Sequence, residues 1–171
     1  PGSTGPVKLS CEEARFLKLI NLYRAQFGIA PLVASGKATL AARWHSNDMG
    51  VNRYFSHTDS LGRDPYERTA QFGFGYCQGE NAAAGNYGAT ETFCQWKLSP
   101  GHAGNMQGGH FRSIGIGRAI VGGAEYGVYW STPFGVGYDA ADKIEEPITD
   151  ESNCVMPTSL PLPSNSSGSN R

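Results

Sequence analysis

The fold class is decided by residues 113–131, which read SIGIGRAIVGGAEYGVYWS. Two runs that alternate or carry β-forming residues, 113–120 and 126–131, flank a five-residue link with two glycines. This pattern predicts a β-hairpin. The segments before it have the apolar spacing of helices instead. Helices packed on a small, mostly antiparallel sheet make a layered α+β domain, and we expect that architecture here.

Four helices are predicted ahead of this hairpin. Ser10 and Glu13 form a capping-box pattern at the start of the first helix. Asp64 precedes a proline and has a glutamate three residues later, and this pattern begins the third helix. The first, second and fourth helices are expected over about residues 10–28, 37–51 and 89–98.

Three short segments place polar side chains in predicted loops. They are residues 55–59 (FSHTD), 79–81 (GEN) and 99–102 (SPGH), the last because a proline forbids the fourth helix from continuing. Loops with a histidine or glutamate beside glycine often present binding groups. If the segments converged, two imidazoles and a carboxylate would form a divalent-metal site or an acid/base pair. Their spacing is not a local ligand motif, so spacing alone does not establish a shared site.

The composition limits the classes of function. The chain has 171 residues, with 14 Lys and Arg against 15 Asp and Glu, so its formal charge is −1. No basic excess is present to neutralise a phosphate backbone, and we therefore expect no nucleic-acid partner. No stretch approaches the ~20 apolar residues of a transmembrane helix, so no integral membrane segment is expected. No secretory leader is visible, which means that a signal peptide is already removed or was never present.

The organisation of the chain is that of one domain with two flanking segments. Residues 1–9 are predicted to be a flexible lead-in, 10–155 the domain, and 156–171 a tail rich in serine, proline and asparagine. Asn165 begins an N-glycosylation sequon in that tail, where it would be accessible. The domain is expected to be monomeric.

The four cysteines allow three disulfide pairings, and the sequence does not choose among them. We favour a bridge from Cys11 to Cys154, which would tie the two ends of the fold. The second would join Cys77 to Cys94 and clip a central loop to a helix. Two bridges would indicate an oxidising compartment and hence secretion. The alternative is four free thiols in a cytosolic protein.

Several motifs in the same order resemble the CAP superfamily, which contains cysteine-rich secretory proteins, insect antigen 5 and plant pathogenesis-related proteins. The matching pieces are HSNDM at 45–49, YFSHT at 54–58, GEN at 79–81, SPGH at 99–102 and GIG at 115–117. The resemblance covers most of the chain. It implies a three-layer α-β-α sandwich and an extracellular location.

The resemblance also implies a central cleft with two histidines and two glutamates. His57 and His102 match the two histidines, and Glu80 matches the glutamate of the GEN motif. A second glutamate of the family lies three residues after the tryptophan of the fourth helix, where this chain has Ser99. Glu67 is the candidate replacement.

For some polar residues near these motifs, a purely structural role is an alternative to a role in the site. Glu67 stands where a capping-box glutamate belongs, so a structural role and a site role are both open. Asn81 is expected to line the cleft as a structural loop residue. His45, on the second helix, is expected to be a packed or surface histidine.

We expect a secreted binding module whose cleft holds a divalent cation through His57 and His102. Zinc is preferred, with magnesium or calcium as alternatives, and the Glu80 carboxylate would orient an imidazole or a metal-bound water. The first alternative, implied by the same resemblance, is a sterol or another small lipid, bound near residues 71–76 and 121–125. The second is metal-assisted hydrolysis with Glu80 or Glu67 as general base. No serine or cysteine lies in a recognisable nucleophile elbow, so an enzyme is not favoured, and contact with an extracellular protein is the remaining alternative.

Overall fold

The structure is a computed structural model that describes residues 6–145. The predicted tail, with Asn165, lies outside the described residues. The helices are α1 (Cys11–Gln26), α2 (Gly36–Val51), α3 (Pro65–Gln71), α4 (Ala89–Lys97) and α5 (Pro100–Met106), with a short 3-10 turn at Ala140–Asp142. The strands are β1 (Val33–Ala34), β2 (Cys77–Ala84), β3 (Ser113–Ile114), β4 (Gly117–Ile120) and β5 (Val128–Gly135).

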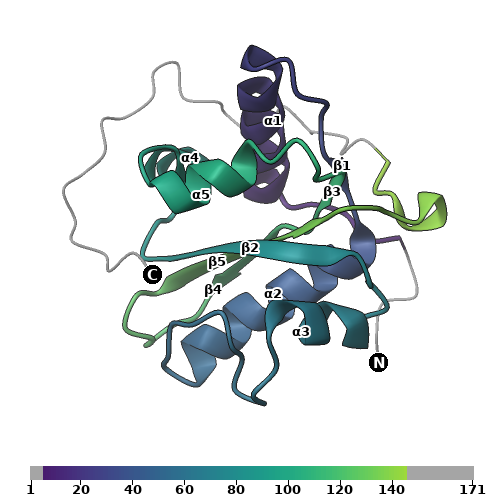
Figure 1. The fold of residues 1–171 in the computed structure, drawn as a ribbon. Coiled ribbons are helices and arrows are strands. Elements are labelled where there is room, and N and C mark those ends of the chain that lie inside the picture. Colours follow the sequence, from purple (N-terminus) through teal and green to yellow (C-terminus); the bar gives the residue numbers. More distant parts are fainter. Residues whose placement is uncertain (1–5, 146–171) are drawn as a thin grey trace.

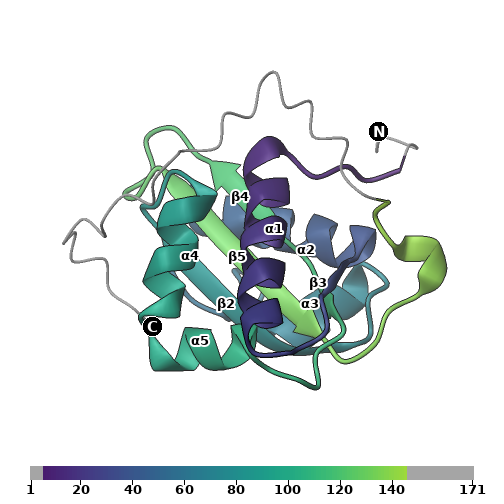
Figure 2. The ribbon, with the colours of Figure 1, turned by 90° about the horizontal axis from the view of Figure 1, so that it is seen from above.

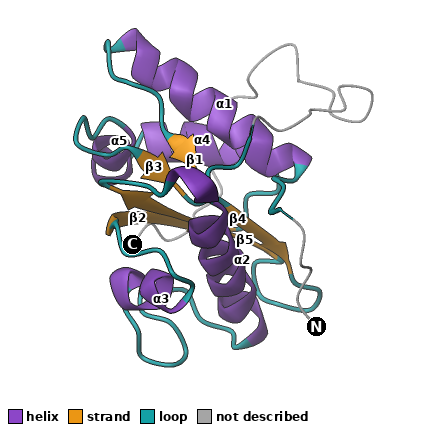
Figure 3. Cartoon of the chain, turned by 90° about the vertical axis from the view of Figure 1, so that its right-hand side faces the viewer, coloured by secondary structure: helices purple, strands orange, loops and turns teal. Residues whose placement is uncertain are grey.

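The helices form two layers with the sheet between them (Figure 1). Helices α1, α4 and α5 cover one face, and α2 and α3 cover the other, as Figure 3 also shows. The sheet has the order β1-β3-β5-β2, and β4 also pairs with β5. Among the strands of residues 6–145, β1 and β3 form the one parallel pair, so the sheet is mostly antiparallel. These observations confirm the predicted three-layer α+β sandwich.

Aromatic side chains fill the space between the sheet and the α1/α4 layer, where the two helices lie side by side (Figure 2). Phe16 of α1 meets Trp96 of α4 edge to face, with ring centroids 5.2 Å apart. Trp130 of β5 lies 6.0 Å from the same phenylalanine ring. All three side chains are fully buried. This cluster is the main hydrophobic core of the domain.

On the opposite face of the sheet, glycine residues let α2 approach the strands closely. A Cβ atom at Gly115 would lie 2.4 Å from the backbone carbon of Ala38, and one at Gly117 would lie 2.1 Å from that of Ala42. Neither position has room for a side chain. The GIG motif therefore sets the distance between α2 and this part of the sheet.

Four helices and the hairpin were predicted correctly, but two loop predictions are wrong. Residues 79–81 lie inside strand β2, whose Glu80, Asn81, Ala82 and Ala83 are all buried. A strand buried on both faces lacks the polar–apolar alternation that reveals a strand in sequence. Pro100 does end α4, but it also occupies the first turn of α5, where its missing N–H costs nothing.

The predicted bridge between Cys77 and Cys94 is wrong, because both cysteines are free. Cys77 packs with Ala38 and Phe74 on the α2 face, whereas Cys94 packs against the core on the α4 face, so the sheet separates them. Burial raises the pKa of the Cys77 thiol to about 11, so it stays protonated. Cys11 is an exposed free cysteine, and its predicted partner Cys154 lies outside the described residues.

Candidate functional site

Strand β2 lies at the edge of the sheet and presents consecutive polar side chains to opposite faces. Successive side chains of a strand alternate between faces. Glu80 accordingly meets Arg68 of α3, while the Asn81 amide donates to the backbone oxygen of His102 in α5 at 3.1 Å. Asn105 of α5 donates to the Asn81 side-chain oxygen at 2.9 Å. One strand thus joins the α3 side of the molecule to the α5 side.

Glu80 is the centre of the polar cluster. Its side chain is 1% exposed and forms an ion pair with the Arg68 guanidinium. The His57 Nδ1 lies 2.9 Å from Oε1, and the Ser131 hydroxyl donates to Oε2 at 3.0 Å. His45 Nε2 is 3.9 Å from Oε1. The carboxylate therefore has partners on both oxygens.

These partners decide the charge of Glu80. Burial alone would raise the pKa of this carboxyl, but the His57 hydrogen bond and the Arg68 charge outweigh burial and hold the pKa below its ordinary value. A carboxylate with a lowered pKa is a weak general base near neutral pH. Glu80 is thus suited to orienting a neighbour rather than to accepting a proton from substrate.

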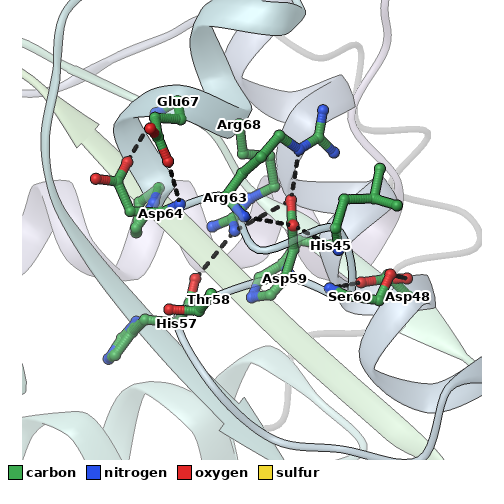
Figure 4. A network of polar contacts seen from close by, with 12 residues as sticks. His45, Asp48, His57, Thr58, Asp59, Ser60, Arg63, Asp64, Glu67 and Arg68 are labelled. Atoms are coloured by element: carbon green, nitrogen blue, oxygen red, sulfur yellow. Dashed lines mark hydrogen bonds and ion pairs between the residues drawn. The ribbon is translucent and has the colours of Figure 1, made fainter.

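Arg68 is buried, with 1% of its side chain exposed, and it has two hydrogen-bond acceptors and one further carboxylate at ion-pair distance. Besides Glu80, its Nη1 donates to the His57 backbone oxygen at 3.0 Å and lies 3.9 Å from the Asp59 carboxylate. Asp59 in turn accepts from Arg63 Nε at 2.9 Å. Figure 4 shows the Asp59 carboxylate beside these arginines. Arg68 thereby joins α3 to the loop that carries His57.

That loop is also fixed where it leaves α2. Asp48, near the end of α2, accepts from the backbone N–H of Ser60 at 2.9 Å and from its hydroxyl at 2.6 Å (Figure 4). The Tyr54 hydroxyl donates to the same carboxylate. These hydrogen bonds hold the pKa of Asp48 below its ordinary value, although burial opposes them. The His57 loop is therefore tied to α2 through Asp48 and to α3 through Arg68.

The His57 ring is fixed at one nitrogen and accessible at the other. Its side chain is 44% exposed, and Nδ1 is engaged by Glu80. Among the residues that the structure describes, no hydrogen bond reaches its Nε2. The second ring nitrogen is thus open to a ligand.

His102 is held in a similar way on α5. Its Nδ1 lies 2.9 Å from the Ser99 hydroxyl, and its ring stacks on Trp96 with centroids 5.8 Å apart. Burial, followed by the charge of His57, lowers the pKa of His102 below its ordinary value. Ser99 stands where the resemblance places a glutamate, and here it supports the imidazole.

Glu67 is placed in the capping box of α3. It accepts from the backbone N–H of Asp64 at 3.0 Å, and its own N–H donates to the Asp64 carboxylate at 2.8 Å. The side chain is exposed, and no contact joins it to His57 or Glu80 in the described residues (Figure 4). The next residue, Arg68, meets Glu80 instead.

Two members of the cluster carry no clear signal in the sequence. His45 is fully buried, and its Nε2 donates to the backbone oxygen of Ser56 at 2.9 Å. Arg68 follows the predicted capping-box glutamate and looks like any helical arginine. Only helix periodicity counted from Pro65 could have placed Arg68 on the inner side of α3.

The described residues offer few side chains that could bind a metal ion. No group of three or more His, Cys, Asp or Glu side chains that could hold a metal ion occurs within residues 6–145. Within this part of the chain, no hydrogen bond occupies the Nε2 atom of His57 or of His102, whose Nδ1 atoms are engaged by Glu80 and Ser99. None of the helices described is long and apolar enough to cross a membrane.

Comparison with known proteins identifies the domain. The model of the CAP family, described as the cysteine-rich secretory protein family, matches residues 17–134. The chain belongs to the CAP family. Its CAP domain is 30% identical over 133 residues to the uncharacterized protein YkwD of Bacillus subtilis, covering 77% of this chain and 50% of that protein.

Solved structures have the same fold as this CAP domain. An extracellular protein with an SCP domain from Bacillus anthracis superposes with a TM-score of 0.65 at 25% identity, covering 72% of this chain and 40% of that one. An outer surface protein from Borrelia burgdorferi superposes with a TM-score of 0.63 at 19% identity, covering 77% and 98%. The chain thus spans half or less of YkwD and of the Bacillus anthracis protein.

Proposed function

We propose that this CAP domain is an extracellular binding module in which His57 and His102 hold a divalent cation, zinc first. The observation that supports this is the state of the two rings. Each has Nδ1 engaged within the protein, by Glu80 or Ser99, while no hydrogen bond of the described residues occupies Nε2. Metal-binding histidines in proteins usually have their second nitrogen fixed in this manner.

The chemistry of the donors favours zinc over the other ions considered. Neutral imidazole is a good ligand for zinc, whereas magnesium and calcium prefer oxygen. Two protein ligands would leave coordination positions for water or for a group of a partner. Glu80 is neutralised by Arg68, so it fits the role of orienting His57 better than that of a ligand.

The extracellular location is proposed from the relatives. One similar structure is described as an extracellular protein and another as an outer surface protein. The family itself is named for secretory proteins. The free cysteines within the described residues give this location no support of their own.

The alternative functions have less support. For hydrolysis, Glu80 has a lowered pKa and Glu67 is engaged in a helix cap. For lipid binding, Phe74 of the predicted 71–76 segment is buried against α2 rather than exposed. Contact with an extracellular protein is compatible with cation binding, because the cation would have open positions.

The test is a zinc titration by calorimetry at pH 7.5, where unperturbed imidazoles are neutral. The wild-type domain should bind close to one zinc ion, and His102→Ala should weaken binding at least about tenfold. His110→Ala is the matched control, because His110 is exposed and its ring lies against Phe111 instead. Absence of binding by the wild type, or equal binding by His102→Ala, would refute the proposal.

A further inference from the structure

One buried guanidinium holds His57 at two points. The Arg68 Nη1 donates to the His57 backbone oxygen at 3.0 Å, and its Nη2 pairs with Glu80, the residue that engages His57 Nδ1. Arg68 therefore fixes the main chain of His57 directly and the ring through Glu80. No other described side chain contacts His57 in both ways.

The ion pair also decides which nitrogen of His57 carries the proton. An ionised carboxylate only accepts hydrogen bonds. Since Arg68 and Glu80 are both 1% exposed, the guanidinium keeps the carboxylate ionised in a place where a lone charge would be costly. The His57 Nδ1 must then donate to Glu80, and the lone pair of the neutral ring lies on Nε2.

We propose that Arg68 is a positioning residue of the cation site: through Glu80 and the His57 backbone it holds His57 in the Nδ1–H tautomer with a bare Nε2. This inference rests on the proposed function. A bare nitrogen lone pair is what a metal ion requires of an imidazole. Arg68 therefore prepares the ligand before the cation arrives.

The shape of arginine matters as well as its charge. A guanidinium presents several N–H groups in a fixed fork, so that two nitrogens of Arg68 reach two different acceptors. A lysine ammonium is a point charge on a flexible stem and does not reproduce this geometry. Arg68→Lys would keep a positive charge near Glu80 but lose the hydrogen bond to the His57 main chain, so the His57 ring would no longer be held against the carboxylate that fixes its tautomer.

The test uses Arg68→Lys on the intact chain, with two readouts. Imidazole ¹⁵N chemical shifts of the metal-free protein report the His57 tautomer, and a zinc titration reports affinity. We expect the wild type to show the Nδ1–H form, and Arg68→Lys to show mixed tautomers and bind zinc about 10- to 100-fold more weakly. The matched control is Arg43→Lys, because Arg43 also contacts a buried glutamate, Glu13, through two nitrogens, at 2.9 and 2.6 Å.

Each result has a defined meaning. An Nε2–H tautomer in the wild type overturns the inference. This result needs no variant, so it can be obtained even if Arg68→Lys fails to fold. Unchanged tautomer and unchanged zinc affinity in Arg68→Lys also overturn it, as does an equal loss in Arg43→Lys. If the wild type shows the Nδ1–H form but binds no zinc, the proposed cation function fails while the positioning of the ring by Arg68 still stands on the tautomer result.

Discussion

Glu67 and Glu80 carry the same side chain in different surroundings. Glu67 is exposed at the first turn of α3, where it accepts a backbone N–H that the helix leaves unpaired. Glu80 is buried on β2 and is bonded to His57, Ser131 and Arg68. Burial and partners, rather than residue type, therefore separate the structural carboxylate from the one in the site.

This difference predicts separate effects of two substitutions. Glu67→Ala should lower the free energy of unfolding by about 0.5–1 kcal/mol through the lost cap and should leave zinc affinity unchanged. Glu80→Gln should weaken zinc binding, because it removes the anion that orients His57. Urea unfolding and calorimetry on both variants measure the two effects. Weaker zinc binding by Glu67→Ala would place Glu67 in the site after all.

At the scale of the residue, the sequence motifs indicated His57, Glu80 and His102. The structure brings the first two into direct contact, while His102 lies on α5 against Ser99 and Trp96. The resemblance carried this information, since the loop spacings alone did not. Arg68 was not singled out, and His45 was expected to be a packed or surface histidine with no place in the site, because burial is a property of the fold. An arginine or histidine on a helix gives no local sign that its inner side will meet a carboxylate from a distant strand.

At the scale of the element, the contact between α2 and β4 depends on a missing side chain. A Cβ at Gly117 would lie 2.1 Å from the carbonyl carbon of Ala42, and backbone cannot move aside as a flexible side chain can. The helix would have to shift away from the sheet. Since α2 also carries His45 and Asp48, the shift would reach the polar cluster.

We therefore expect Gly117→Ala to lower the free energy of unfolding by about 1–3 kcal/mol through overpacking. Gly122→Ala is the control, because a Cβ there meets no atom within 4 Å and the position lies in the hairpin turn. Chemical denaturation of both variants measures the difference. Equal stability of the two variants would contradict the close contact of α2 with β4.

Elements with strong local patterns were predictable, and those defined by tertiary burial were not. The capping boxes at Ser10 and Asp64 and the apolar spacing of α1 gave correct helices. Strand β2 was read as a loop because its polar residues are buried by partners that lie far away in sequence. Helix α5 was missed because a proline ends one helix and begins the next, and the two meanings look alike in sequence.

At the scale of the whole molecule, buried ionisable groups make stability depend on pH. Burial lowers the pKa of His45 below its ordinary value of 6.5, so the folded domain keeps this ring neutral while the unfolded chain takes up a proton. The unfolded state then binds more protons below about pH 6.5, and stability falls as the pH falls. Above that pH the contribution of His45 is constant.

We expect the free energy of unfolding to decrease between pH 7.5 and 5.5, by up to about 1.4 kcal/mol per pH unit for His45 below its unfolded pKa. His45→Gln should reduce this slope, since glutamine does not titrate. A second loss should begin near the ordinary pKa of glutamate, 4.5, because the pKa of Glu80 is also lowered in the folded state. Urea unfolding at a series of pH values measures both windows, and a wild-type slope equal to that of His45→Gln would contradict the assignment.

The arrangement of layers was the most predictable property of the molecule. Helices followed by a hairpin predicted a layered α+β domain, because helices and sheets bury their apolar faces against one another. The family resemblance supplied the three-layer sandwich. The pairing of cysteines was the least predictable, because it depends on which face of the sheet each thiol reaches. Cys77 and Cys94 reach different faces, and their separation along the chain says nothing about this.

The register of β2 has a consequence for how the chain tolerates insertions and deletions. The strand pairs with β5 through Glu80 opposite Pro133 and Asn81 opposite Thr132, after an irregularity between Cys77 and Gly79. A slip of one residue would turn every side chain to the other face, so that Asn81 would meet Arg68 and Glu80 would meet α5. The irregularity can absorb an insertion or deletion that precedes it. An insertion or deletion just after Gly79 would instead turn the side chains of the strand to the opposite faces. The few residues around Gln78 thus determine which side chains of β2 face α3 and which face α5.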